Sequence, residues 1–242
     1  MNRDQVSIAT ITWARDEQEE TLLRNSLQHL ATLGIPVFIT DGGSGDGFLD
    51  FLRGFPYFTL FNATQKGVWM QAKNSLAQAY QSGSPFIFYT EPDKLDFFAH
   101  ALPQMLENIL VNEQSGIMLA ARSADGFATF PAFQQMTETT INNCCAEVTG
   151  KFLDYTYGPF LMNRQLVPYL NVLEPNIGWG WRPYAFGIAS RLGYNAEAFT
   201  GNFYCPPEQQ QDSPAERIYR MRQLSQNIEG ITLSATADLQ KK

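Results

Sequence analysis

Two carboxylates one residue apart, Glu91 and Asp93, are the residues whose types and spacing point most directly to chemistry. They follow an apolar run, residues 85–90 (PFIFYT), and Pro92 stiffens the turn that carries them. Mg²⁺ and Mn²⁺ prefer such oxygen ligands and often share them with the phosphates of a substrate. A metal at this turn would offset the charge that builds on a departing diphosphate. The alternative is an ordinary polar turn without a ligand.

A glycine-rich loop, residues 41–47 (DGGSGDG), follows a second apolar run at residues 36–40. Glycines such as Gly43 let the backbone turn sharply and approach a ligand. Asp41 is placed to accept hydrogen bonds from a base or a ribose. The loop lacks the G-x-G-x-x-G spacing of dinucleotide sites, so no nicotinamide cofactor is predicted. The alternative is a plain strand-to-helix turn in which Asp46 is the cap.

Basic and hydroxyl side chains near these loops are candidates for contacts with a diphosphate. Lys66 and Lys73 lie at the start and in the middle of a segment with helical periodicity, and Lys or Arg side chains pair with phosphate. Thr12 and Arg15 follow the first apolar run of the chain. The alternative for the lysines is a solvated helix face.

A third candidate segment, residues 178–182 (GWGWR), lies in the second half of the chain. Trp179 and Trp181 are flanked by glycines, and aromatic faces stack on sugar rings. Arg182 is suited to hold an anionic group of an acceptor. The alternative is a turn in the core, with one of the tryptophans buried.

The elements that must position these residues alternate between strands and helices. This alternation predicts an α/β fold with a mostly parallel, doubly wound sheet and helices on both faces. Ligands bind at the carboxyl ends of such strands, where the clusters at residues 12–16, 41–46 and 91–93 fall. The expected strands are residues 6–11, 36–40, 57–61, 85–90 and 116–121, and the expected helices are 16–33, 67–80 and 96–112.

The alternation breaks after about residue 122. A helix over residues 133–150, a strand at 158–162 and a helix from about Arg164 are expected there, followed by a helix that ends at Leu192. Ser213-Pro214 is typical of the start of a final helix. This half is predicted to complete the same domain by covering the ligand edge.

Composition limits the class of protein. A chain of 242 residues with 44% hydrophobic residues can form one large domain with a real core. The formal net charge of −7 argues against a nucleic-acid partner, whose affinity comes largely from Lys and Arg. Three cysteines without a C-x-x-C pair indicate neither a zinc site nor a disulfide framework. Neither a signal peptide nor a transmembrane segment is visible, so a cytoplasmic location is expected.

Taken in order, the motifs resemble the family-2 type of GT-A glycosyltransferases over roughly residues 5–195. VSIATITWARDE is similar to the first strand and loop of that family, and ITDGGSGDG is similar to its Asp-Asp-Gly-Ser-x-Asp-Gly element, with Gly42 in place of the second Asp. QKGVWMQAKNSLAQA resembles the helix with Ala-Arg-Asn, with Lys73 in place of Arg. FIFYTEPDKLDFF resembles the strand that ends in the Asp-x-Asp metal motif, and NIGWGWRPYAFGIASRLGYN resembles the Gly-Trp-x-Glu-Asp helix.

This resemblance implies a GT-A fold that binds a nucleotide-diphosphate sugar and a small-molecule or glycan acceptor. Asp41 would contact the nucleoside, Glu91 and Asp93 would hold Mn²⁺ or Mg²⁺, and Asp212 would supply a third ligand. The expected organisation is a single GT-A-like domain over residues 1–242. Residues 1–121 form its nucleotide-sugar-binding half, and residues 122–242 form its acceptor-side half with the C-terminal helix. The sequence does not set the oligomeric state.

One departure from the family bears on catalysis. An acidic pair in inverting members supplies the general base, whereas Arg182-Pro183-Tyr184 stands at that place here, with no carboxylate from residue 177 to 194. The chain is then a retaining enzyme, similar to mannosylglycerate or glucosylglycerate synthases, with Arg182, Tyr184 and Asp212 as candidate catalytic residues. Alternatively, Glu174 or Asp212 serves as the base, or the domain binds a nucleotide sugar without transferring it. A nucleotidyltransferase is disfavoured because residues 12–15 (TWAR) lack its signature loop.

Overall fold

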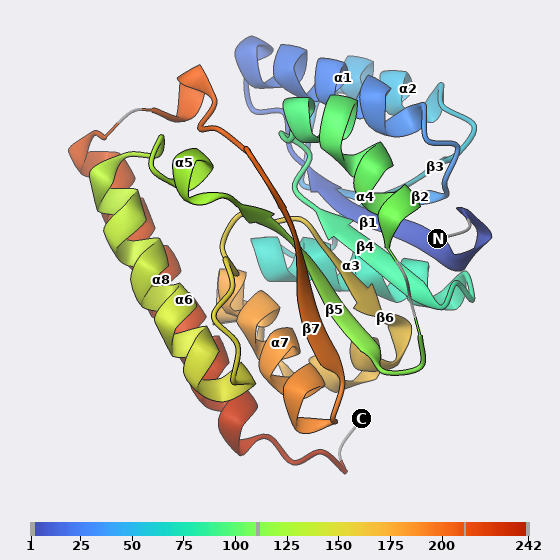
Figure 1. The fold of residues 1–242 in the computed structure, drawn as a ribbon. Helices are drawn as coiled ribbons and strands as arrows, with labels where there is room; N and C mark the ends of the chain where they lie inside the picture. The colour runs from blue at the N-terminus through green and yellow to red at the C-terminus, as the bar shows by residue number, and fades with distance from the viewer. Residues whose placement is uncertain (1–2, 110–111, 211, 241–242) are drawn as a thin grey trace. The chain divides into compact units, whose positions relative to one another are not determined.

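The computed structural model describes residues 3–109, 112–210 and 212–240. The chain divides into two compact units (Figure 1). The first consists of Met1–Glu113 and Pro159–Val167, and the second of Gln114–Gly158 and Pro168–Lys242. The expectation of one domain with a division at residue 121 stays a prediction.

The first unit is built on parallel strands. They are hydrogen-bonded in the order β3-β2-β1-β4-β6, and every pair is parallel except β4 with β6. All residues of β1 and β4 are buried, as expected for strands covered on both faces. The strands are β1 (Val6–Thr12), β2 (Val37–Asp41), β3 (Phe58–Asn62), β4 (Phe86–Thr90) and β6 (Phe160–Asn163).

Helices cover both faces of these strands. The segment α3 packs on β1, β2 and β4, while α1 contacts α2 and η2 across the other face, as right-handed crossovers require. The predicted cap of the first helix is confirmed, because the Asp16 carboxylate accepts a hydrogen bond from the Glu19 backbone N–H at 2.8 Å. The helical segments are η1 (Arg3–Gln5), α1 (Glu17–Ala31), α2 (Asp46–Arg53), α3 (Val68–Gln81), η2 (Phe97–Ala101) and α4 (Leu102–Asn108).

The second unit pairs two parallel strands and packs three long helices together. The strands are β5 (Ser115–Arg122) and β7 (Asn195–Gly201), and the helices α6, α7 and α8 contact one another. Ser213 caps α8 and Pro214 is its first residue, as predicted. The helical segments are α5 (Ala124–Phe127), α6 (Ala132–Thr149), η4 (Pro175–Gly180), α7 (Trp181–Arg191), η5 (Pro207–Gln209) and α8 (Pro214–Thr236).

Three sequence expectations differ from the structure. The helix expected from Arg164 is a 3₁₀ segment, η3 (Arg164–Val172), because Pro168 inside it lacks the N–H that an α-helix needs. The helix expected to reach residue 112 ends at Asn108, where Ile109 turns to extended backbone. The strand β7 was not predicted, since Ala196 is its one fully buried side chain and alternation is weak. The fold class itself, α/β with a mostly parallel sheet, is confirmed.

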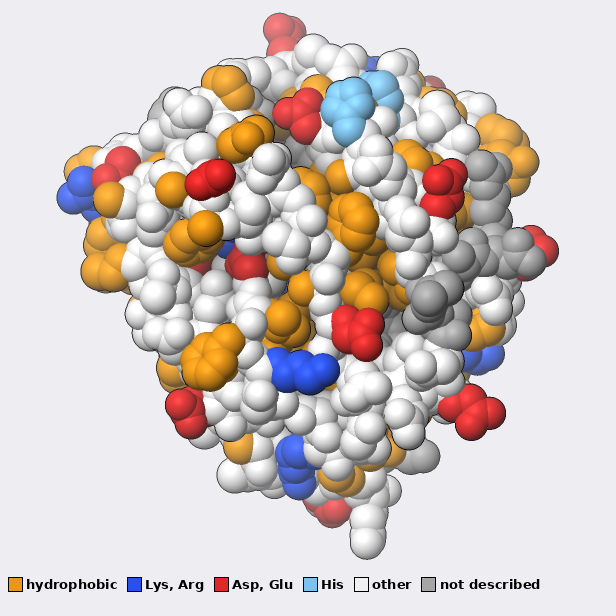
Figure 2. Space-filling view, in the orientation of Figure 1, with side chains coloured by type: hydrophobic (Ala, Val, Ile, Leu, Met, Phe, Trp, Pro, Cys, Tyr) orange, Lys and Arg blue, Asp and Glu red, His pale blue; other side chains and the backbone are white. Residues whose placement is uncertain are grey.

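Acidic and basic side chains are interspersed on the face that Figure 2 shows, and none of the basic ones form a continuous stripe there. Within the described ranges, no helix is both long and apolar enough to cross a membrane.

Gly180, just before α7, and Gly230, within α8, allow the backbones of these two segments to pack closely. A Cβ at Gly230 would overlap the carbonyl oxygen of Gly180, so the backbones touch. In α2, by contrast, a Cβ at Gly47 would have no heavy atom within 4 Å.

We expect these two helical glycines to respond to alanine with opposite signs. Gly230→Ala should destabilise the protein by about 1–3 kcal/mol, the usual cost of overpacking. Gly47→Ala should stabilise it by about 0.5–1 kcal/mol, because alanine loses less backbone entropy on folding. Urea unfolding of both variants measures the difference. Stabilisation by Gly230→Ala would contradict the close packing of α7 and α8.

Candidate functional site

The loops that follow β1 and β2 meet at the carboxyl ends of these strands. Thr12 pairs with Asp41 in the parallel register, and its hydroxyl donates to the Asp41 Oδ2 at 2.8 Å. The Ala14 backbone N–H donates to the Ser44 hydroxyl oxygen at 2.8 Å. The topology therefore brings the first two predicted clusters together at one edge.

The Asp41 carboxylate holds the glycine-rich loop. It is 2% exposed and accepts from the Thr12 hydroxyl, the Ser44 hydroxyl at 2.6 Å, and the backbone N–H groups of Gly43 at 2.8 Å and Ser44 at 2.7 Å. Gly43 has φ 121°, a value that favours glycine. These four bonds use the acceptor capacity of a carboxylate. Any part of Asp41 in binding a nucleoside would therefore act mainly through the loop it shapes.

Two residues beside this loop were not singled out from the sequence. Trp13 directly follows β1 and is 52% exposed, with the Arg15 guanidinium 5.7 Å from its ring centre. Gln71 on α3 is 7% exposed, and its Oε1 has no hydrogen-bond partner among the described residues. A Cβ at Gly42 would lie 2.9 Å from Gln71 Nε2 and 3.2 Å from Trp13 Cβ, so both side chains flank the loop.

A buried acceptor without a hydrogen-bond partner destabilises a protein by about 1–3 kcal/mol. A donor from a bound ligand would remove this cost at the Gln71 amide oxygen. The available signal in the sequence was a polar residue on the buried face of an amphipathic helix next to the ligand edge. That signal is weak, because α3 also buries Ser75, whose hydroxyl donates to the Gln71 carbonyl oxygen at 3.1 Å.

The basic candidates of this unit lie in different surroundings. Lys66 is exposed before Gly67, whose φ is 116°. Lys73 is half-buried on α3, with its ammonium 5.8 Å from the Trp69 ring centre. Arg15 is exposed, and its Nε donates to Glu19 Oε2 at 2.8 Å. Arg15 is thus partly committed to α1 rather than to a ligand.

The Glu91–Asp93 turn follows β4 and is tied to β1. The Thr10 hydroxyl of β1 donates to the Thr90 carbonyl oxygen at 2.8 Å, one residue before Glu91. Both carboxylates are half-buried, and the Lys94 ammonium, missed in the sequence, lies 3.5 Å from Asp93 Oδ1. The turn therefore carries two negative charges and one positive charge at the carboxyl end of β4.

This donor set fits a metal that also binds phosphate. Across the described residues there is no group of three or more Asp, Glu, His or Cys side chains suited to a metal ion. Mg²⁺ is commonly held by one or two carboxylates together with waters and substrate phosphates. Glu91 and Asp93 match that pattern in the number and type of their carboxylates.

The two tryptophans of residues 178–182 differ in burial. Trp181 is fully buried, which favours the core alternative for this residue over a role in stacking on a sugar. Trp179 is half-buried, with the Arg182 guanidinium 4.8 Å from its ring centre and its Nε1 donating to the Tyr219 hydroxyl at 3.1 Å. Tyr184 is 2% exposed, and burial raises the pKa of its phenol. Trp179 is the tryptophan that remains accessible to a ligand.

Asp212 is exposed and paired with Arg217. The guanidinium Nε and Nη2 donate to the two carboxylate oxygens at 2.9 and 2.8 Å. The hydrogen bond from Arg217 lowers the pKa of Asp212, so the carboxylate is ionised at neutral pH. As a metal ligand, Asp212 would have to exchange this arginine for the ion.

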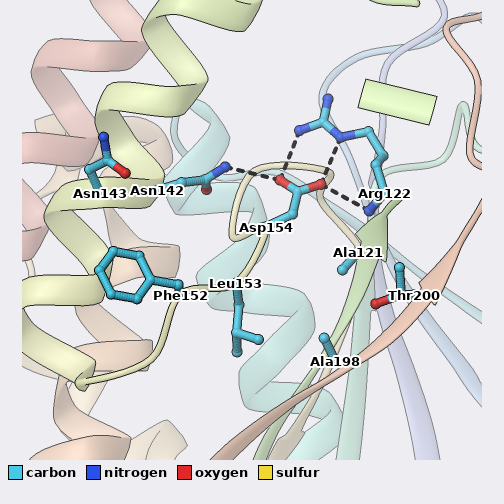
Figure 3. Close-up of a pocket in the computed structure, with 9 residues that line it drawn as sticks. All are labelled: Ala121, Arg122, Asn142, Asn143, Phe152, Leu153, Asp154, Ala198 and Thr200. Atoms are coloured by element: carbon cyan, nitrogen blue, oxygen red, sulfur yellow. Dashed lines mark hydrogen bonds and ion pairs between the residues drawn. The ribbon is translucent and has the colours of Figure 1, made fainter. Parts of the chain in front are cut away.

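The second unit also has a pocket that sequence reasoning missed (Figure 3). It is lined by side chains of α6, β5, β7 and the segment 152–154. The lining residues are Ala121, Arg122, Asn142, Asn143, Phe152, Leu153, Asp154, Ala198 and Thr200.

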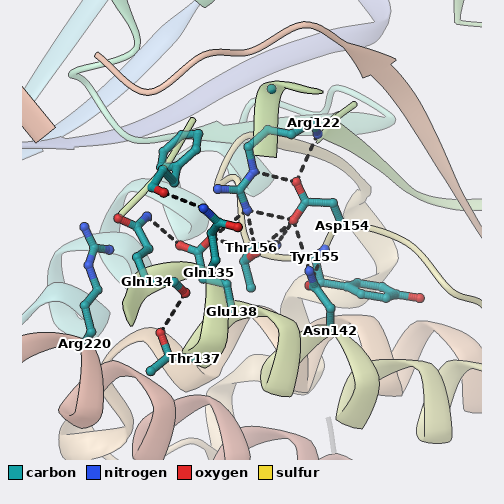
Figure 4. A network of polar contacts seen from close by, with 12 residues as sticks. Arg122, Gln134, Gln135, Thr137, Glu138, Asn142, Asp154, Tyr155, Thr156 and Arg220 are labelled. Atoms are coloured by element: carbon teal, nitrogen blue, oxygen red, sulfur yellow. Dashed lines mark hydrogen bonds and ion pairs between the residues drawn. The ribbon is translucent and has the colours of Figure 1, made fainter. Parts of the chain in front are cut away.

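A buried charge network adjoins this pocket (Figure 4). The Arg122 side chain is 1% exposed, and it forms ion pairs of 2.7 Å with both Glu138 Oε2 and Asp154 Oδ2. Burial acts to raise the pKa of Asp154, but hydrogen bonds and charge from Arg122 outweigh it and lower the pKa to about 2. The rings of Phe127 and Phe130 lie 4.7 and 4.6 Å from the guanidinium carbon. The network joins β5 to α6 and to the segment before β6.

No family model matches the sequence, and no curated protein matches it. Solved structures match over most of the chain. Glucosyl-3-phosphoglycerate synthase from Mycobacterium tuberculosis, in complex with Mn²⁺, uridine diphosphate and phosphoglyceric acid, matches with a TM-score of 0.62 and 15% identity, over 96% of this chain and 79% of that one. The same synthase with Mn²⁺, uridine-diphosphate-glucose and phosphoglyceric acid matches with a TM-score of 0.64 and 14% identity, over 93% and 80%.

Mannosyl-3-phosphoglycerate synthase from Rubrobacter xylanophilus matches with a TM-score of 0.65 and 14% identity, over 96% of this chain and 74% of that one. At such identities the likeness establishes the architecture. The chain has the GT-A fold that its motifs resemble.

Proposed function

We propose that this protein transfers a sugar from a nucleotide-diphosphate sugar to a small acceptor, with the help of a divalent metal. The observation that carries the proposal is the edge of the first unit. There the Thr12–Asp41 bond joins two loops, and the Glu91–Asp93 turn is tied to the intervening strand through Thr10. Support comes from a synthase of the same fold that was crystallised with Mn²⁺, uridine-diphosphate-glucose and phosphoglyceric acid.

In this proposal the nucleoside lies against the loops after β1 and β2. The exposed ring of Trp13 offers a stacking surface for a base, and the buried Oε1 of Gln71 accepts a hydrogen bond from an N–H of that base. Thr12 and Asp41 hold the loop, and Gly43 lets its backbone approach the ligand. Lys73, with Lys66 or Arg15, would pair with the diphosphate.

Glu91 and Asp93 would hold Mn²⁺ or Mg²⁺ at the diphosphate. The metal would supply positive charge that stabilises the leaving diphosphate. Lys94, 3.5 Å from Asp93, partly neutralises the two carboxylates and lowers their mutual repulsion. The positive charge of Lys94 would also offset part of the negative charge of a bound diphosphate.

The acceptor side would be formed by Trp179 and Arg182, where Arg182 is 8% exposed and its guanidinium lies 4.8 Å from the Trp179 ring centre. The segment that holds the base in inverting enzymes has no carboxylate here, so a retaining reaction is the form of transfer that we propose. The roles of Tyr184 and Asp212 in catalysis stay predictions, as does the cytoplasmic location. Tyr184 lies within α7 and is buried, so it would help to position this helix rather than contact a substrate.

A second candidate is a domain that binds a nucleotide sugar without transferring it. The replacement of the acidic pair by Arg182-Pro183-Tyr184, with Tyr184 buried, favours this candidate. The two candidates share the donor site and differ in turnover.

We expect Asp93→Ala to abolish metal-dependent release of nucleoside diphosphate from a nucleotide sugar, because one of two carboxylate ligands is lost. The measurement is product release with UDP-, GDP- and ADP-sugars, with and without Mn²⁺. Asp96→Ala is the matched control, since Asp96 is exposed on the same segment and forms no capping hydrogen bond.

Wild-type turnover that Asp93→Ala retains in full would remove this residue from the site. Saturable nucleotide-sugar binding without any turnover would support the non-catalytic candidate instead.

We expect Gln71→Leu to weaken nucleotide binding without lowering stability. Removing a buried acceptor without a partner should leave stability unchanged or raise it by about 1 kcal/mol. The same change should weaken nucleotide binding about tenfold, since one base contact is lost. Calorimetric titration and urea unfolding measure the two effects, with Gln78→Leu on the same helix as the control. Unchanged nucleotide affinity in Gln71→Leu would exclude Gln71 from base recognition.

A further inference from the structure

The pocket of the second unit owes its space to small side chains on one face of the β5–β7 ladder. Ala121 pairs with Thr200, and Ala198 lies two residues before Thr200 on the same face. These three small residues line the pocket, whose volume is about 380 Å³. Pockets for small molecules begin at roughly 300 Å³, so the space suits a ligand the size of a single sugar ring.

The segment that forms the rim is fixed on both sides of an exposed aromatic residue. The Lys151 ammonium donates to the Ala196 carbonyl oxygen at 2.8 Å, and the Tyr155 backbone N–H donates to Asn142 Oδ1 at 2.8 Å. Asp154 is held by Arg122 at 2.7 Å. Phe152 lies between these anchors and is 84% exposed. The backbone therefore presents an aromatic face at the rim without burying it in the protein.

The charge at the pocket selects against anions. Arg122 lies between Asp154 and Glu138, so the three side chains together carry a net charge of −1, and the guanidinium is 1% exposed. The Asp154 carboxylate, whose side chain is 10% exposed, already accepts hydrogen bonds from Arg122, Asn142 and Thr156, so a ligand meets it as a fixed negative charge. An ionised carboxylate accepts hydrogen bonds and donates none. Phosphates and carboxylates are therefore disfavoured by the net negative charge.

Two further polar side chains of the lining are available to a ligand. Asn143 and Thr200 are exposed, and within the described residues neither side chain forms a hydrogen bond. Figure 3 places Asn143 with Phe152 on the side of α6, and Thr200 on the side of the strands. An amide and a hydroxyl both donate and accept, as hydroxyl groups of a ligand do.

We infer that this pocket binds a neutral sugar or polyol. Hydroxyl groups of the ligand exchange hydrogen bonds with Asn143 and Thr200, while the apolar face of the ring packs on Phe152. An organic ammonium ion would be attracted by the charge of Asp154 and the ring of Phe152, but it would leave the acceptors and donors of Asn143 and Thr200 unused. This binding is separate from the acceptor side at Trp179 and Arg182, and it does not rest on the proposed function.

The test is a titration followed by amide NMR signals, with methyl glucoside, methyl mannoside and glycerol as separate probes. Choline and inorganic phosphate test the two other chemical classes. We expect at least one neutral probe to give saturable shifts at residues 142–143, 152–154 and 198–200. No saturable shift there with any neutral probe, or saturation by choline or phosphate alone, would overturn the inference.

Phe152→Ala should lower the affinity for that probe about tenfold. It should not change the fold, because the side chain is 84% exposed. Met136→Ala is the matched control, since Met136 is 55% exposed on the same helix that lines the pocket but is not part of the lining. Ala198→Leu fills the floor and should abolish binding.

Wild-type affinity in both Phe152→Ala and Ala198→Leu would contradict the assignment. The titration contains no nucleotide, so its outcome is independent of the donor site. Failure of nucleotide-sugar binding together with saturable sugar binding here would overturn the proposed function and leave this site in place.

Discussion

The buried Asp41 carboxylate is the constraint on which the candidate site depends. A carboxylate that is 2% exposed is tolerable because two hydroxyl groups and two backbone N–H groups donate to it. One of the hydroxyls belongs to Thr12, which ends the neighbouring strand, so a single side chain fixes the ends of two strands and the loop between β2 and α2. The Ser44 hydroxyl oxygen also accepts a hydrogen bond from the Ala14 backbone N–H, which fixes the loop after β1 as well. The position of Trp13 then follows from the residues on either side of it.

Charge is arranged differently in the two units. At the end of β4, Glu91, Asp93 and Lys94 together carry a net charge of −1 at a half-buried turn. This charge is suited to a cation that also binds phosphate. In the second unit, Arg122 is enclosed by Glu138 and Asp154 and by two phenylalanine rings. Loss of one member of such a buried group leaves an uncompensated charge, so the network holds β5, α6 and the Phe152 segment in one arrangement.

The sequence predicted the strands of the first unit because each is a short apolar run followed by a polar cluster, as in Val6–Thr12 and Phe86–Thr90. It did not predict β7, whose pairing with β5 depends on a partner far away in the chain. Local patterns also placed Asp41, Glu91 and Asp93 at strand ends. They could not show that the Asp41 carboxylate is also held by Thr12, 29 residues earlier in the chain.

Other features left no local signal in the sequence. Arg122 and Asp154 are 32 residues apart, and neither position is unusual by itself. The pocket arises from three small residues on two separate strands, a pattern that a linear reading does not reveal. The burial of Trp181 beside the half-buried Trp179 follows from how α7 packs, which periodicity over a short aromatic segment does not determine.

The central claim is that the Glu91–Asp93 turn and the loops after β1 and β2 bind one nucleotide and one metal together. Mn²⁺ is paramagnetic, so it broadens the amide signals nearest to it. With a nucleoside diphosphate present, substoichiometric Mn²⁺ should broaden the signals of residues 91–94 most strongly and then those of residues 12–14 and 41–44. Broadening centred on any other segment, or no nucleotide-dependent broadening at residues 91–94, would contradict the account.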